Sequence, residues 1–176
     1  MQALFRIRGT SSLPKVTILL ATFQGAAHLR EQLASIASQE GVNWVLRASD
    51  DGSDDGTLEV LTQFCAAYPD RVTLRAGPRR GAAANFLAML CAPDLAPAPV
   101  ALADQDDIWY PTKLKKALSC LETISDAAVY TARSRHVDAL GRPLGLSRRP
   151  SGAPSFGNAL VQNRVSGHAA VLNPQA

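Results

Sequence analysis

A short apolar segment that ends in three closely spaced aspartates is the feature that most constrains this chain. Residues 100–103 (VALA) have the composition of a buried strand in a parallel sheet, and Asp104, Asp106 and Asp107 follow it at once. Three carboxylates within four residues repel one another unless a cation or a positively charged surface compensates them. Ligands of open α/β sheets bind beyond the carboxyl ends of the strands, where these acids would lie. The sequence therefore predicts a metal site.

The oxygen ligands of this cluster suit Mg²⁺ or Mn²⁺. Such an ion commonly takes one or two protein carboxylates and leaves its other positions to substrate phosphates, so we expect a metal that bridges the protein and a diphosphate. The alternative interpretation is an acidic helix start, in which Asp107 caps a helix and Pro111 stands near its first position.

Strand and helix patterns alternate along the chain, which predicts an α/β fold with a mainly parallel central sheet flanked by helices. The expected strands are residues 15–21, 42–48, 72–76, 100–103 and 127–132. Helices are expected from His28, after Asp54 or Asp55 as N-cap, over residues 82–91 and beyond Pro111. The first has a buried stripe at Leu29, Leu33 and Ile36, the second bears Leu58, Leu61 and Cys65, and the last has a stripe at Leu114, Leu118 and Leu121. Residues 135–145 are expected to form a β-hairpin and residues 147–154 a flexible loop.

The composition is that of one globular domain, with 176 residues of which 47% are hydrophobic and 19% charged, and a net charge of +3. We expect a leader over residues 1–13 and the domain over residues 14–176. No apolar run reaches the roughly 18–20 residues of a membrane span, and we expect a cytoplasmic protein, with attachment to the inner face of a membrane left open. The arginines are scattered along the sequence, which argues against binding of nucleic acid. Cys65, Cys91 and Cys120 are expected to be buried, reduced thiols.

A second acidic loop, DDGSDDG at residues 50–56, follows the strand expected at residues 42–48. The carboxyl ends of parallel strands share one edge, so this loop and the first aspartate cluster can border one cleft. A nucleoside diphosphate offers donors that Asp50 or Asp51 can accept, and a diphosphate that a metal would neutralise. A turn that only caps a helix is the alternative. The sequence contains no G-x-x-x-x-G-K-[ST] loop and no G-x-G-x-x-G, which argues against a P-loop NTPase and a simple Rossmann dehydrogenase.

Four segments in a fixed order resemble the family 2 glycosyltransferases, which have the GT-A fold and use nucleotide-diphosphate sugars. The segments are VTILLATFQ at residues 16–24, DDGSDDGT at 50–57, RGAAANF at 80–86 and ADQDDIWYPTKL at 103–114. The DQDDIW form is most similar to rhamnosyltransferase-type members that build bacterial surface polysaccharides. The resemblance implies transfer of a sugar, from dTDP-rhamnose or a UDP-sugar, to a glycan or lipid-linked glycan acceptor.

The resemblance also implies roles for individual residues. The donor-binding positions are Thr22, Phe23, Gln24, Asp50, Asp51, Arg80, Asn85 and Asp104. Among them, Asp50 or Asp51 would accept from the imide of uracil or thymine, and Arg80 would pair with phosphate or remain a solvated surface residue.

The metal-binding residues that the resemblance implies are Asp106 and Asp104. Asp106 would ligate a divalent metal, Mg²⁺ or Mn²⁺, and Asp104 would contact the ribose, the metal or its waters. Asp107 and Trp109 are expected to support the loop and wall the pocket, although a core role for Trp109 is an equal alternative.

Residues 163–173 (NRVSGHAAVLN) resemble the strand that borders the acceptor, with His168 in place of the residue, often Cys, expected there. His168 is a candidate ligand or base, or a structural histidine. Inverting members use an Asp or Glu downstream of this strand as general base, and the sequence has no acid after Asp138. We therefore expect a GT-A domain without its C-terminal part, and no catalytic residue is assigned. The alternatives are a non-catalytic nucleotide-sugar-binding fragment and a nucleotidyltransferase.

Overall fold

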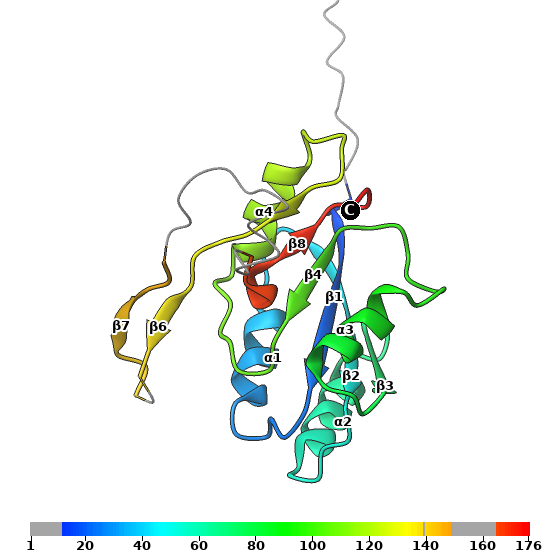
Figure 1. The fold of residues 1–176 in the computed structure, drawn as a ribbon, viewed down its shortest axis with the longest axis vertical. Coiled ribbons are helices and arrows are strands. Elements are labelled where there is room, and N and C mark those ends of the chain that lie inside the picture. Colours follow the sequence, from blue (N-terminus) through cyan, green and yellow to red (C-terminus); the bar gives the residue numbers. More distant parts are fainter. Residues whose placement is uncertain (1–11, 139, 149–164) are drawn as a thin grey trace, which may run out of the picture.

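The computed structural model describes residues 12–138, 140–148 and 165–176, and at its centre is a mixed six-stranded sheet in the order β3-β2-β1-β4-β8-β5 (Figure 1). Its strands are β1 (Lys15–Thr22), β2 (Asn43–Asp50), β3 (Val72–Ala76), β4 (Val100–Ala103), β5 (Val129–Tyr130) and β8 (Val171–Leu172). The helices are α1 (Leu29–Ala37), α2 (Thr57–Ala67), α3 (Ala82–Leu90), α4 (Lys113–Leu121) and the 3₁₀ turn η1 (Gly167–Ala169). Strands β1 to β4 are parallel, and β8 is antiparallel to both its neighbours, so the predicted mainly parallel α/β sheet is confirmed.

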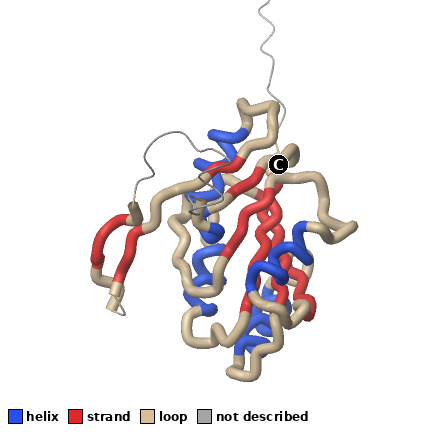
Figure 2. The backbone as a smooth tube through the Cα atoms, viewed as in Figure 1, coloured by secondary structure: helices blue, strands red, loops and turns tan. Residues whose placement is uncertain are grey.

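Helices cover both faces of this sheet (Figure 2), and the side chains of β1 alternate between them. Val16, Ile18 and Leu20 join one apolar core with α1, α2 and α4. Leu19 and Ala21 join a second, smaller core with α3. Because both faces are covered, β1 is apolar along almost its whole length, which is the pattern that its sequence predicted.

The predicted stripes on α1 and α4 are buried as expected, and the predicted helix that bears Leu58, Leu61 and Cys65 is present as α2. Leu58 is 42% exposed, and Val60 and Leu61 are the apolar residues that α2 buries. The predicted N-cap is also wrong, because Gly56 occupies that position with a φ of 95°, a conformation that glycine adopts without strain. Asp55, the residue before this N-cap glycine, still accepts a hydrogen bond from the Thr57 amide at 3.1 Å.

The structure also corrects the alternative interpretation of the first aspartate cluster and the prediction for the cysteines. Helix α4 begins at Lys113 with Thr112 as N-cap, so the acidic helix start at Asp107 is wrong. The expectation of buried thiols is also wrong. All three cysteines are free, but Cys91, the C-cap of α3, and Cys120 are exposed, and Cys65 packs against the edge of the main core and is only half-buried.

The predicted strand at residues 127–132 is only two residues long, because β5 pairs with β8 only at Val129 and Tyr130. Of the predicted acceptor-side strand, residues 163 and 164 lie outside the described residues, and η1 precedes the two-residue β8. Residues 1–11 of the predicted leader and 149–154 of the predicted loop also lie outside them.

The predicted hairpin is present as β6 (Arg135–Val137) and β7 (Pro143–Leu146), an antiparallel pair that stands away from the central sheet (Figure 1). Within the described part of the chain, no helix has both the length and the apolar character needed to cross a lipid bilayer.

Candidate functional site

The loops that bear the predicted site residues lie along one edge of the sheet, since β1 to β4 are parallel. The chain adds β2 and β3 on one side of β1 and then places β4 on the other side, so the strand order reverses between β1 and β4. Open α/β sheets bind their ligands in the crevice at such a reversal. The loops after Thr22 and after Ala103 therefore border the expected binding position.

Gln105 joins these two loops. Its side chain accepts a hydrogen bond from the Phe23 amide at 2.8 Å and donates one to the Phe23 carbonyl at 2.9 Å. A Cβ at Gly25 would come within 2.3 Å of the Gln105 side-chain oxygen, so a larger residue at this position would displace the Gln105 amide from Phe23. The Phe23 ring itself is 56% exposed at this edge. Sequence reasoning missed Gln105, because an amide between aspartates shows no partner until the fold is known.

Asp50 orders the second acidic loop. Its buried carboxylate accepts hydrogen bonds from the Thr22 hydroxyl at 2.8 Å, the Gly52 amide at 3.1 Å, and the Ser53 amide and hydroxyl at 2.8 and 2.7 Å. Burial raises the pKa of Asp50, but the donors of Ser53, Thr22 and Gly52 outweigh it, and the net pKa is lowered. Asp50 is therefore held ionised at neutral pH.

Asp51 performs the same task for the loop after β3. Its two carboxylate oxygens accept from the amides of Arg79 and Gly81, each at 2.7 Å. Asn85 is buried and donates to the Ser49 carbonyl at 2.9 Å, and its own side-chain oxygen has no partner among the described residues. Arg80 is exposed on this loop. Recognition of a base by Asp50 or Asp51, and of phosphate by Arg80, stays a prediction.

Gln24 ties the β1 loop to the second acidic loop. It has a positive φ of 52°, and its side chain donates to Asp54 at 2.6 Å and accepts from the Asp54 amide at 3.2 Å. Its backbone amide donates to the Ser53 hydroxyl at 2.9 Å. The predicted donor-binding segments after β1 and β2 are thus one connected structure.

A cluster of three potential metal ligands lies beyond β4. Oxygens of Asp104 and Asp107 and a ring nitrogen of His168 all lie within 4.8 Å of one another. Asp106, which the motif favoured as ligand, is exposed and lies outside this group. The structure therefore brings Asp104 together with Asp107 and a histidine from the far end of the chain. Hereafter, the ligand cluster means Asp104, Asp107 and His168.

The electrostatics of the ligand cluster favour a bound cation. Burial raises the pKa of both Asp104 and Asp107, and repulsion from Asp106 raises each further, whereas His168 and Lys113 act in the opposite direction. One carboxylate oxygen of Asp107 is buried without a hydrogen-bond partner among the described residues. Carboxylates whose ionised form is disfavoured in this way gain most from a divalent cation, which removes the repulsion and fills the vacant acceptor.

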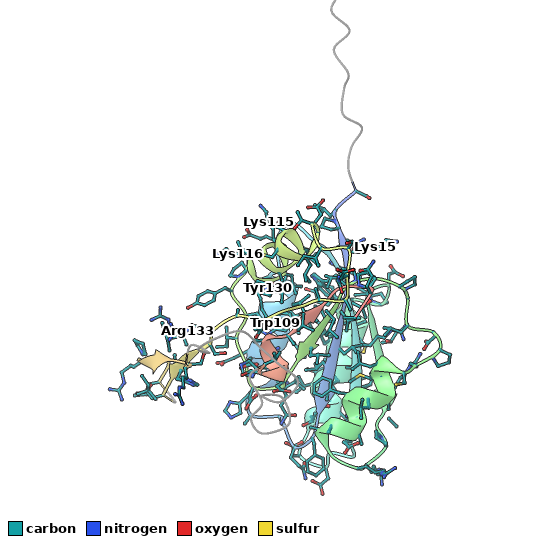
Figure 3. The ribbon with its side chains drawn as sticks, turned by 45° about the horizontal axis from the view of Figure 1, so that its top comes forward. Lys15, Trp109, Lys115, Lys116, Tyr130 and Arg133 are labelled. Carbon is teal, nitrogen blue, oxygen red and sulfur yellow. The ribbon has the colours of Figure 1, made fainter. Side chains whose placement is uncertain are left out.

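Lys113 is the basic residue beside the ligand cluster. Its ammonium donates to the His168 carbonyl at 2.8 Å and lies 3.4 Å from the centre of the Trp109 ring. Burial lowers the pKa of Lys113 to about 7, against the opposing effect of Asp107 and Asp104. Trp109 is buried in the body of the protein, near the C-terminal segment (Figure 3), which supports the core interpretation of this residue.

Comparisons with known proteins agree with this geometry. The chain matches the family described as Glycosyl transferase family 2 over residues 17–169. It is 36% identical over 105 residues to the dTDP-rhamnosyl transferase RfbG of Shigella flexneri, which covers 58% of this chain and 36% of that protein. It is 34% identical over 115 residues to EpsE of Bacillus subtilis (strain 168), itself only a proposed glycosyltransferase, with 64% of this chain and 40% of that protein covered.

Two solved structures have a similar fold. The mannosyltransferase PcManGT from Pyrobaculum calidifontis, in complex with GDP-Man and Mn²⁺, gives a TM-score of 0.58 at 24% identity and covers 69% of this chain and 36% of that chain. S. aureus TarS 1-349 in complex with UDP-GlcNAc gives 0.51 at 20% identity over 65% of this chain and 33% of that chain. The present chain thus spans between 33% and 40% of the length of these four proteins.

The fold and the loops at its binding edge define the class: this is a GT-A domain, the α/β fold predicted from the sequence. The chain belongs to glycosyl transferase family 2, and the resemblance carried by its four sequence segments is confirmed.

Proposed function

We propose that this chain binds a nucleotide-diphosphate sugar and a divalent cation at the carboxyl edge of its sheet, as the donor site of a glycosyltransferase. The observation that carries the proposal is the ligand cluster, which lies beyond β4 beside the reversal of strand order. The donor class is supported by the nucleotide sugars present in the two solved relatives. The similarity to a dTDP-rhamnosyl transferase supports dTDP-rhamnose, with a UDP-sugar as the second choice.

The residues present fit a divalent cation. Two carboxylates and one imidazole are suitable ligands for Mn²⁺ and, through the oxygens, for Mg²⁺. The vacant oxygen of Asp107 provides an acceptor that no described residue fills. When bound, the cation would supply positive charge to the diphosphate leaving group. We assign the ligands as Asp104, Asp107 and His168, and retain Asp106 as the alternative that the motif favours.

The other residues of this edge shape the donor pocket. The exposed Phe23 ring offers an apolar face for a base, and Arg80 is free to approach a phosphate from the loop that Asp51 holds. Asp50 and Asp51 contribute by fixing the loops on which these side chains stand. The acceptor that we propose is a growing surface glycan or its lipid-linked form, met at the inner face of the membrane.

Calorimetric titration of dTDP and UDP into the purified chain, with Mn²⁺ and then with EDTA, tests this proposal. We expect nucleotide binding that requires the metal, with a preference for one of the two bases. Binding that is unchanged by EDTA would remove the metal from the donor site, and failure of a folded chain to bind either nucleotide would overturn the proposal.

A matched pair of variants separates the two ligand assignments. Asp107→Asn should strongly weaken Mn²⁺ binding, whereas Asp106→Asn, the same change one residue earlier on an exposed side chain, should leave most of it intact. The reverse result would return the metal to Asp106, as the motif implies. Circular dichroism of both variants verifies that they are folded.

A further inference from the structure

We propose that Ser134, at the base of the β6–β7 hairpin, is a positioning residue for the metal ligand His168. Ser134 would accept a hydrogen bond from the Nε2–H of His168 and leave Nδ1 with a free lone pair for the cation. The inference rests on the proposed function, because it takes His168 as a metal ligand. It adds a residue that lies outside all four of the sequence segments that identify the family.

The two ring nitrogens of His168 face different partners. Nε2 lies 2.7 Å from the Ser134 hydroxyl oxygen, which is hydrogen-bond distance. Nδ1 lies 4.0 Å from a carboxylate oxygen of Asp104, which is too long for a hydrogen bond. Two ligand atoms that are each about 2.1 Å from one ion lie at most about 4.2 Å apart, so the Asp104 and His168 atoms can share a cation.

The position of Ser134 is fixed by hydrogen bonds to Ser147, which follows the second strand of the hairpin. Its backbone amide donates to the Ser147 hydroxyl at 3.0 Å, and its carbonyl accepts from the Ser147 amide at 2.8 Å. Arg133, whose place beside the hairpin is visible in Figure 3, donates to the Ser147 carbonyl at 2.8 Å. Ser134 is therefore held from the hairpin side, independently of the sheet that carries Asp104.

The backbone of His168 is held separately, by the hydrogen bond from the Lys113 ammonium to its carbonyl at 2.8 Å. Loss of the Ser134 hydroxyl should therefore leave η1 in place and release only the ring. A metal-bound imidazole must carry its proton on the other nitrogen, and that N–H requires an acceptor when it is partly buried. Without Ser134, the Nε2–H loses this acceptor, and the ring loses its fixed orientation toward Asp104.

The test compares Mn²⁺ binding by the wild-type chain, Ser134→Ala and Ser134→Thr in calorimetry without nucleotide. Ser134→Ala should weaken binding by about 10- to 100-fold, the range typical of partners that orient a metal-bound histidine. Ser134→Thr keeps a hydroxyl and should retain most of the affinity. Ser119→Ala, the same chemical change on the exposed surface of α4, is the matched control and should bind as the wild type does.

A second readout follows the imidazole itself. In ¹⁵N-labelled protein with the diamagnetic ion Mg²⁺, the His168 nitrogens should show the Nε2–H tautomer in the wild type, and a mixture of tautomers in Ser134→Ala. If the wild type binds Mn²⁺ and Ser134→Ala binds it within about twofold, the role of Ser134 is refuted while the ligand cluster stands. If the wild type does not bind Mn²⁺, or His168→Ala binds as well as the wild type, the ligand assignment itself fails.

Discussion

The carboxylate of Asp50 is almost completely buried at the end of β2, and the hydroxyls of Thr22 and Ser53 reach it together with two backbone amides. Burial alone would favour the neutral acid, and these donors outweigh it, so the pKa of Asp50 is lowered. A carboxylate whose pKa is lower in the folded than in the unfolded chain stabilises the fold. This contribution is complete above the unfolded pKa of about 3.9 and is lost as the pH falls through the folded value.

Ser53→Ala removes one of these donors, and we expect the free energy of unfolding at pH 7 to fall by about 1–2 kcal/mol. Because protonated Asp50 accepts hydrogen bonds poorly, the difference between variant and wild type should shrink as the pH falls below about 4 and through the lowered pKa of Asp50 in the folded chain. Urea unfolding at pH 7 and at pH 3 measures both values. An equal difference at the two pH values would show that Ser53 does not act through the charge of Asp50.

Helix α1 and the residues just after it support the loop that carries Asp104 and Asp107. The Ser35 hydroxyl accepts from the Trp109 amide at 3.0 Å. The Gln39 side chain donates to the Tyr110 carbonyl at 2.9 Å and accepts from the Leu114 amide at 3.1 Å. The Leu114 amide lies in the first turn of α4, where the helix itself provides no acceptor, and the Tyr110 carbonyl also accepts from the Lys113 amide at 2.9 Å. The loop after Asp107 is therefore held by an element that precedes it by several strands.

Gln39→Ala leaves the buried Leu114 amide without its acceptor, whereas the Tyr110 carbonyl still accepts from the Lys113 amide at 2.9 Å, and we expect the free energy of unfolding to fall by about 1–3 kcal/mol. Hydrogen exchange should be faster at Leu114 than in the wild type, because its amide loses a buried acceptor. Gln63→Ala, on the exposed face of α2, is the control for loss of a glutamine side chain. Unchanged exchange at Leu114 would contradict the supporting role of Gln39.

At the scale of the whole molecule, the last described segment completes the central sheet. Strand β8 lies antiparallel between β4 and β5, and η1 just before it carries His168 to the ligand cluster. Asn173 closes this arrangement: its side chain donates to the Asp126 carbonyl at 2.7 Å and accepts from the Ala128 amide at 2.9 Å. The packing of residues 167–173 against the sheet therefore also places His168 in the ligand cluster.

Asn173→Ala removes both side-chain bonds at a buried position, and we expect it to lower the free energy of unfolding by about 1–3 kcal/mol in urea titrations. Gln175→Ala, at an exposed position two residues later, should change it little. Equal effects of the two substitutions would mean that β8 is not secured by Asn173.

The sequence by itself determined the elements whose pattern is local. Strand β1 is a continuous apolar run, and α1 carries the apolar stripe Leu29, Leu33 and Ile36. Because the buried side of a helix or strand recurs at a fixed residue spacing, both elements can be predicted from the order of apolar residues along the chain. The place of Asp104 at the carboxyl edge of the sheet was predictable for the same reason, since it directly follows a buried strand.

Tertiary structure alone decided which groups meet at that edge. The ligand cluster joins the loop after β4 to η1, and Ser134 reaches His168 from the hairpin, so no pattern within one segment reports these contacts. The choice of Asp107 over Asp106 as the neighbour of Asp104 and His168 depends on the path of the loop that Ser35 and Gln39 hold. Side-chain direction in an irregular loop has no period, and it is set by distant hydrogen-bond partners, which only the folded chain brings together.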